Sequence, residues 1–291
     1  MDSLSVLLSG LALGSVYGLV ALGFHISWSV CGAVNFAQGS SAMMGAVATF
    51  MLWQAGLPMP LAIILALMLC AFYGLLVEQL AVRPFLARRS DAWLMATVAL
   101  GLVCDNGMML VFGAEPRSLP SPLATGSVSV AGMDLGIYPL HLLMPVVVLV
   151  LACALDLVRR KTLAGIAMQA VAQNRDAASL VGIPVPIMIA IAFMLSSLLA
   201  GIGGILIAPL ANVQTDMGVV LGLKAFAVAI LGGLGNAWGI VAAGLLFGMA
   251  EAAVTLSLGS GFTQIVTFAL VIAALAIRPQ GLLGRALVRK A

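Results

Sequence analysis

The chain has 291 residues, of which 63% are hydrophobic and 8% are charged, and its mean hydropathy is +1.20. This composition excludes an ordinary soluble globular domain and is typical of a protein that crosses a membrane several times. The net charge of +3 comes from basic residues grouped near the ends of apolar runs, so it carries information about topology and gives no support for binding nucleic acid.

Apolar runs of about the 20 residues needed to cross a bilayer follow one another along the chain. We expect an all-α polytopic membrane protein with about nine spans (eight to ten), forming one transmembrane domain over residues 1–291. The expected spans are 4–25, 39–57, 60–80, 92–113, 138–158, 187–208, 218–235, 239–257 and 262–277.

Eleven of the thirteen Lys and Arg residues fall into three groups between or after these runs. The groups are Arg83, Arg88 and Arg89; Arg159, Arg160, Lys161 and Arg175; and Arg278, Arg285, Arg289 and Lys290. Basic residues near span ends stay on the cytoplasmic side. The three groups therefore predict a cytoplasmic C-terminus, an N-terminus on the outside and an odd number of crossings.

Glycines spaced by four residues occur in two of the expected spans. The first set is Gly10, Gly14 and Gly18, and the second is Gly244 and Gly248. Small residues at this spacing let the backbones of two membrane helices approach closely. We interpret both sets as helix-packing faces.

Two stretches interrupt the apolar pattern: "NFAQG", which contains Asn35 and Gln38, and "GGLGNAWG", which contains Asn236. Non-helical backbone at membrane depth must be enclosed by protein or line a water-filled cavity, and transporters use such broken helices at their binding sites. One hypothesis is that Asn35, Gln38 and Asn236 line a translocation path. The alternative is that each stretch is a tight turn near the membrane surface.

The sequence contains none of the motifs that would indicate an enzyme. It has no G-x-x-x-x-G-K-[ST] phosphate loop, and His25 and His141 stand apart from any Ser and Asp at catalytic spacing. Cys31, Cys70, Cys104 and Cys153 are widely spaced and resemble small core residues more than a disulfide set or a metal site. We therefore expect no catalytic residues and no bound metal.

Three charged residues lie well inside expected spans, away from the span ends: Asp105, Lys224 and Glu251. Charges within a bilayer are costly and usually have a partner. Lys224 stands twelve residues before Asn236 and Glu251 fifteen after it, which places both about 18–22 Å from that turn at 1.5 Å per residue. We expect these two residues to pair, with Asp105 as a competing partner for Lys224. The alternative is that each charge reaches the interface by itself.

The segment 164–182, between two expected spans, is predicted to form a short cytoplasmic helix. At 100° per residue its side chains form two neighbouring arcs. One arc holds Ile166, Ala170, Ala177 and Val181, and the other holds Gln169, Gln173, Asp176 and the apolar Leu180. Gly182 and Pro184 should end the helix. Such a helix either lies on the membrane surface or docks into a groove on a cytoplasmic partner.

The stretch "DAASLVG", Asp176 to Gly182, resembles the E-A-A-x-x-x-G loop by which ABC importer permeases meet their ATPases, with Asp in place of Glu. The longer stretches "VNFAQGSSAMMGA", "LLVEQLAVRPF", "AVAQNRDAASLVGI", "KAFAVAILGGLGNAWG" and "RPQGLLG" resemble the permease of the branched-chain amino acid importer, the LivH type. The resemblance implies an ATPase-coupling role for Gln169, Gln173, Arg175, Asp176, Ala177, Ala178, Leu180 and Gly182.

The resemblance also implies partners: a second, similar permease, two ATP-binding subunits that carry ATP and Mg²⁺, and a periplasmic substrate-binding protein. This chain would then bind no cofactor itself and would lie among the lipids of the inner (plasma) membrane. Substrates of such permeases include branched-chain and other amino acids, urea and short amides. The rival hypothesis is a secondary transporter driven by an ion gradient, in which Asp105, Lys224 and Glu251 titrate during transport.

Overall fold

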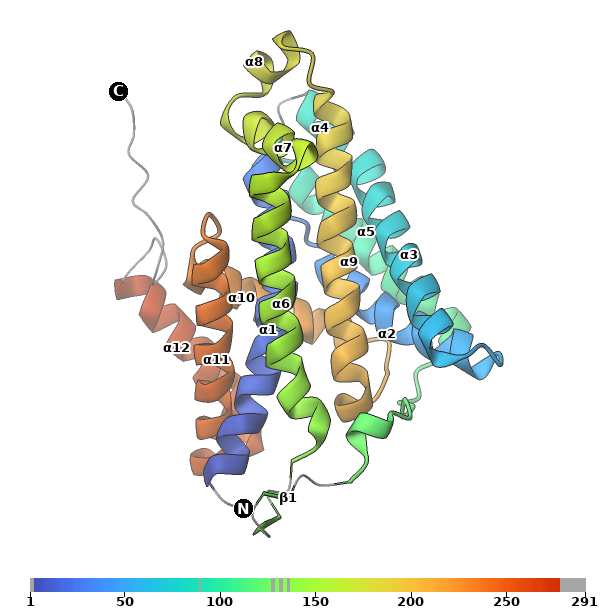
Figure 1. The fold of residues 1–291 in the computed structure, drawn as a ribbon, viewed down its shortest axis with the longest axis vertical. Helices are drawn as coiled ribbons and strands as arrows, with labels where there is room; N and C mark the ends of the chain where they lie inside the picture. Colours follow the sequence, from blue (N-terminus) through green and yellow to red (C-terminus); the bar gives the residue numbers. More distant parts are fainter. Residues whose placement is uncertain (1–2, 89, 127–128, 131–132, 135–136, 278–291) are drawn as a thin grey trace. The chain divides into compact units, whose positions relative to one another are not determined.

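The computed structural model describes residues 3–88, 90–126, 129–130, 133–134 and 137–277. Most of the described residues are helical (Figure 1). The strands among them form a small antiparallel pair, β1 (Ser129–Val130) and β2 (Met133–Asp134). The all-helical class expected from the sequence is therefore confirmed.

Each predicted span corresponds to a helix in the described residues. These helices are α1 (Ser3–Cys31), α2 (Gln38–Gln54), α3 (Met59–Val77), α5 (Trp93–Phe112), α6 (Pro139–Lys161), α9 (Val185–Ala211), α10 (Met217–Gly232), α11 (Ala237–Leu258) and α12 (Ser260–Ile277). Within the described part of the chain, six helical segments are long and apolar enough to cross a membrane. They comprise α1, α5, α6, α9, α11 and α3 with its continuation to Leu86. The count of nine and the orientation of the termini stay predictions.

Shorter elements connect these helices. After α3 come a π-helix, η1 (Glu78–Val82), and α4 (Arg83–Ala87); a 3₁₀ turn, η2 (Pro122–Ala124), precedes the strands; and α7 (Leu163–Gln173) and α8 (Arg175–Leu180) connect α6 to α9. Proline and glycine mark several boundaries. Pro184 is the N-cap of α9, and Gly259, with a φ of 84°, follows the last residue of α11. Only glycine adopts such a φ without strain.

The chain divides into two compact units. The first contains the described residues of Met1–Leu22, Pro120–Ala152 and Lys224–Ala291, and the second those of Gly23–Leu119 and Cys153–Leu223. In the second unit α2, α3 and α9 pack against one another, and α5 packs against α2. In the first unit α12 packs against α11.

Glycines allow close backbone contact in both units. In the first unit a Cβ at Gly244 would lie 2.7 Å from the Gly14 carbonyl oxygen and from the Gly18 Cα. In the second unit a Cβ at Gly45 would lie 2.6 Å from the Gly201 Cα. Such distances leave no room for a methyl group, so the two glycine sets of α1 and α11 form one helix contact. This is the packing that small residues permit in membranes.

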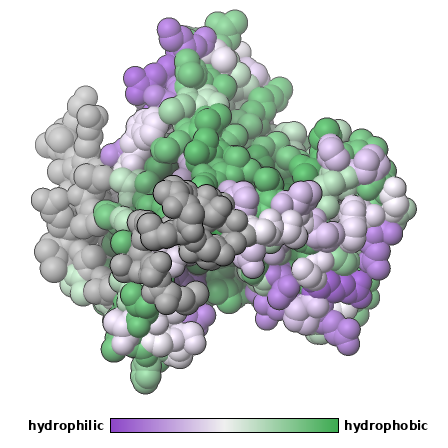
Figure 2. Space-filling view, turned by 60° about the horizontal axis from the view of Figure 1, so that its bottom comes forward, coloured by the Kyte–Doolittle hydropathy of each residue, from purple (hydrophilic) through white to green (hydrophobic). Residues whose placement is uncertain are grey.

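Large apolar side chains remain exposed on several long helices. Met68 of α3 is 58% exposed and Leu110 of α5 is 89% exposed. Hydrophobic residues cover much of the surface visible in Figure 2. An exposed apolar surface of this extent fits contact with lipid or with other membrane subunits.

We predict that Gly14→Ala lowers the stability of the protein by about 1–3 kcal/mol, the usual effect of overpacking a tight contact. The new methyl group would overlap the backbone of α11 at Gly244 and Gly248. Thermal unfolding of the purified protein in detergent measures the loss of stability. Gly107→Ala is a matched control, because Gly107 also lies within a helix but a Cβ there has open space. Equal stability of the two variants would contradict the packing role.

Candidate functional site

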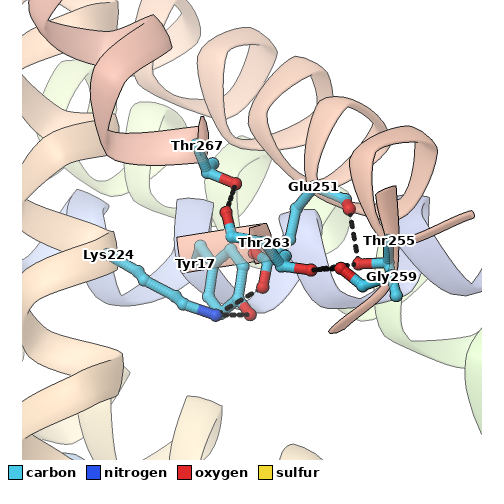
Figure 3. Close-up of polar contacts among 7 residues, drawn as sticks. All are labelled: Tyr17, Lys224, Glu251, Thr255, Gly259, Thr263 and Thr267. Atoms are coloured by element: carbon cyan, nitrogen blue, oxygen red, sulfur yellow. Dashed lines mark hydrogen bonds and ion pairs between the residues drawn. The ribbon is translucent and has the colours of Figure 1, made fainter. Parts of the chain in front are cut away.

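A largely buried charge cluster lies in the first unit (Figure 3). The Nζ of Lys224, on α10, contacts Oε1 of Glu251, on α11, and lies 3.2 Å from the Tyr17 hydroxyl oxygen, on α1. The side chains of Lys224 and Glu251 are each 12% exposed. Lys224 also lies over the Tyr17 ring, 5.2 Å from its centroid. The cluster therefore joins three helices through one ammonium group.

The position of the pair follows from the turn between α10 and α11. This turn is closed by a 2.9 Å hydrogen bond from the Asn236 amide to the Gly233 carbonyl. The helices run in opposite directions from it, so Lys224 and Glu251 reach similar distances along them. Tyr17 was not predicted. The sequence feature that could have identified it is its position three residues after Gly14, on the glycine-bearing face of α1.

Asp105, the third charged residue of the prediction, lies on α5 in the second unit. Its Oδ1 is buried and has no hydrogen-bond partner in the part of the chain that the structure describes. The role predicted for it in a network with Lys224 stays a prediction.

A series of threonines continues from the Glu251 backbone (Figure 3). Thr255 Oγ1 donates to the Glu251 carbonyl at 2.8 Å and lies 2.9 Å from Thr263 Oγ1 on α12. Thr267 in turn donates to the Thr263 carbonyl. These hydroxyls join α12 to the end of α11 that follows the charge pair, and sequence reasoning missed them. Hydroxyl pairs of this kind bind membrane helices together.

A second polar network is enclosed in the second unit. Gln38 Nε2 donates to the Ser196 carbonyl at 2.9 Å, and Ser196 Oγ lies 2.9 Å from Gln38 Oε1. Ser196 Oγ also lies 2.8 Å from the Gly23 carbonyl oxygen, and Asn35 Nδ2 donates to Gln38 Oε1 at 3.3 Å. Asn35, Gln38 and Ser196 are all fully buried. The "NFAQG" interruption is thus surrounded by protein, as non-helical backbone at membrane depth requires.

Asn236, the third residue of the predicted path, is the N-cap of α11 in the first unit. Its Oδ1 accepts a 3.2 Å hydrogen bond from the Gly239 amide. An asparagine that satisfies a free amide of the first turn is a standard helix start. This geometry matches the tight-turn alternative for "GGLGNAWG". Lining of a translocation path by Asn35, Gln38 and Asn236 stays a prediction.

The segment 164–182 is not one helix, as predicted, but two. It breaks at Asn174, whose backbone is extended, with φ −159° and ψ 110°. The Asn174 side chain accepts a 3.0 Å hydrogen bond from the Ala177 amide and so caps α8. Asparagine competes for backbone hydrogen bonds in this way and favours caps over helix interiors. The two arcs expected from a continuous helix are therefore wrong across this residue.

Gly182 ends α8, as expected. Its φ is 84°, its amide donates to the Ser179 carbonyl at 3.1 Å, and the Ile183 amide donates to the Ala178 carbonyl at 3.0 Å. Left-handed glycine after a helix is the usual C-terminal motif. The chain then turns into α9 at Pro184.

The residues assigned to coupling fall into an anchoring group and an exposed group. Gln169 donates to the Arg159 carbonyl at 2.5 Å, Arg175 donates to the Cys31 carbonyl, and Ala178 is buried. The exposed members are Gln173, Asp176, Ala177 and Leu180. Leu180 is 87% exposed and its neighbour Val181 is 77% exposed. The end of α8 therefore presents two apolar side chains to its surroundings.

We predict that Lys224→Ala and Glu251→Ala each destabilise the protein by about 3–5 kcal/mol, because each leaves a largely buried charge without its partner. The double variant should lose less than the sum of the two. The amount of folded protein and its thermal unfolding measure the double-mutant cycle. Strictly additive losses would contradict an interaction between the two side chains.

The chain is similar over nearly its whole length to known permeases. The model of the family described as "Branched-chain amino acid transport system / permease component" matches residues 6–275. The LivH permease proteins of Salmonella typhimurium and Escherichia coli K12 are each 30% identical over 300 residues, covering 99% of this chain and 97% of the relative. BraD of Pseudomonas aeruginosa is 30% identical over 301 residues, with the same coverage. No solved structure matches the chain significantly. Because both comparisons span almost all of it, this chain belongs to the branched-chain amino acid transport permease family.

Proposed function

We propose that the chain is the membrane-spanning permease subunit of an ABC importer for branched-chain or related amino acids. The observation that carries this proposal is the family match over residues 6–275. The relatives are named as high-affinity branched-chain amino acid transport permeases. Other amino acids, urea and short amides are the further substrate classes for such a subunit.

In this proposal, ATP and Mg²⁺ bind to two separate ATPase subunits, and the permease meets them through α7 and α8. The exposed Leu180 and Val181 support this assignment, since they lie at the end of a short helix with exposed polar residues such as Asp176. Exposed apolar groups with a polar rim are typical of protein-binding surfaces.

We call α7 and α8 together the coupling segment, and its contacts suggest how a movement would reach the spans. Both α7 and α8 pack against α9, and α9 carries Ser196 of the buried network with Gln38. A ligand or partner shifts a conformational equilibrium only through contacts that differ between the two states. Movement of α7 and α8 by the closing ATPases would supply such contacts.

The remaining parts of the proposed assembly are a second homologous permease subunit and a periplasmic substrate-binding protein. The proposed location is the inner membrane, with the N-terminus outside and the C-terminus in the cytoplasm. The grouping of Lys and Arg residues supports this orientation.

Co-purification tests the proposal. An affinity-tagged permease, expressed together with its native partners and extracted in mild detergent, should bring ATP-hydrolysing subunits with it. Leu180→Asp should weaken that association by at least tenfold, because it places a charge on the apolar end of α8. Transport by the wild-type permease alone in vesicles, driven by an ion gradient and without ATPase subunits, would instead establish the secondary transporter.

We predict that Gly182→Val and Asp176→Lys lower transport and transport-linked ATP hydrolysis while the permease still reaches the membrane. Valine at a φ of 84° adds about 1–2 kcal/mol of backbone strain at the C-cap, and lysine reverses the charge at the proposed contact. Gly56→Val is a matched control, because Gly56 also has a positive φ, 95°, and open space around it. Normal coupling in both coupling-segment variants would contradict the docking role.

A further inference from the structure

A buried carboxylate lies in the π-helix that follows α3. Glu78 is 1% exposed, and its Oε1 accepts a 3.0 Å hydrogen bond from Arg83 Nε. Its Oε2 is buried and has no hydrogen-bond partner among the described residues. Buried carboxylate oxygens without partners are rare and require an explanation. Single π-turns within helices also occur frequently at functional sites.

Arg175, the first residue of α8, reaches across to a different helix. Its guanidinium donates to the carbonyl oxygen of Cys31, the last residue of α1. The end of a helix carries unpaired carbonyls and a partial negative charge, so a cation is stabilised there. Arg175 thereby connects the proposed coupling segment to the end of a long apolar helix.

The π-turn and the coupling segment belong to the same apolar core of the second unit. The hydrophobic cluster that contains Cys31 includes Val77 beside Glu78, and Val171 and Ala178 from α7 and α8. Cys31 itself belongs to this cluster, and its carbonyl is the group that Arg175 binds. The acceptor that Arg175 uses in this structure and the π-turn that carries Glu78 therefore border the same apolar core.

We propose that Arg175 and Glu78 are positioning residues that form a two-state latch between the coupling segment and the spans. In the state of this structure Arg175 binds the Cys31 carbonyl. When α8 shifts, the same guanidinium binds Glu78 Oε2. This inference rests on the proposed coupling role of α7 and α8.

The exchange has a physical basis in both states. Arg175 has an acceptor in both states, the Cys31 carbonyl in one and Glu78 Oε2 in the other, so its guanidinium is never left without a partner. An ion pair with a buried carboxylate is also stronger than one in water, because the surroundings screen it less. The two states thus differ in a specific contact, as a conformational switch requires.

Reconstituted complexes with the partner subunits test the latch through the ratio of substrate transported to ATP hydrolysed. Arg175→Gln and Glu78→Gln should each lower this ratio at least fivefold, while the ATPases still co-purify. The double variant should be no worse than the more impaired single variant, because both changes disable one switch. Arg175→Lys, which keeps the charge, should recover part of the loss.

Arg160→Gln is the matched control, since Arg160 is an exposed basic residue just before the coupling segment, paired with Asp156. It should leave the ratio unchanged. A normal ratio in Arg175→Gln, or effects that multiply in the double variant, would overturn the latch. Loss of ATPase binding in Arg175→Gln would also overturn it, since the arginine would then belong to the docking surface.

Reaction of the native Cys31 thiol with a maleimide, quantified by mass spectrometry, provides a readout without these variants. Cys31 is 3% exposed here. Its labelling should rise at least threefold in ATP-trapped complexes, because the shift of α8 removes Ala178 from the apolar cluster that covers the thiol. Equal labelling in both states would overturn the exchange even if ATPase binding is normal. Failure of the ATPases to co-purify at all would instead contradict the proposed function.

Discussion

Close contact between helix backbones is the constraint on which the rest of this structure depends. Lipid tails are as apolar as the side chains they replace, so helices in a membrane associate through packing and internal hydrogen bonds. In the first unit this contact is made by Gly14 and Gly244, and in the second by Gly45 and Gly201. The glycine face of α1 also fixes where Tyr17 lies, and therefore where Lys224 finds its second partner.

Close packing leaves little room for water, so polar groups in the two cores depend on one another. Gln38 and Ser196 exchange hydrogen bonds between α2 and α9, and Lys224 meets Glu251 between α10 and α11. Within the described ranges, the buried side-chain oxygens left without a partner belong to three acids: Glu78, Asp105 and Glu251. A buried carboxylate oxygen without a partner is costly, so polar satisfaction is incomplete at these three acids.

The coupling segment combines firm anchors with a free end. Gln169 and Arg175 hold it to backbone carbonyls of α6 and α1, whereas Leu180 and Val181 contact little of the chain. The break at Asn174 lets α7 and α8 take different directions, so α7 can pack against α9 while the end of α8 is exposed. A single helix over 164–182 would not separate these two tasks.

The sequence by itself determined the helical class, the positions of the long helices and the glycine end of α8, because hydrophobic run length and glycine chemistry are local properties. It also identified Lys224 and Glu251 as partners, since the two residues lie at similar distances along the chain from the turn at Asn236. Only the tertiary structure decided which groups meet across distant segments. Tyr17, Ser196 and the carbonyl of Cys31 gained their partners through helix packing, and nothing in their local sequence specifies a neighbour more than a hundred residues away. Asn174 was misjudged because helical periodicity continues through it, and the extended backbone that its side chain stabilises at a cap outweighed that pattern.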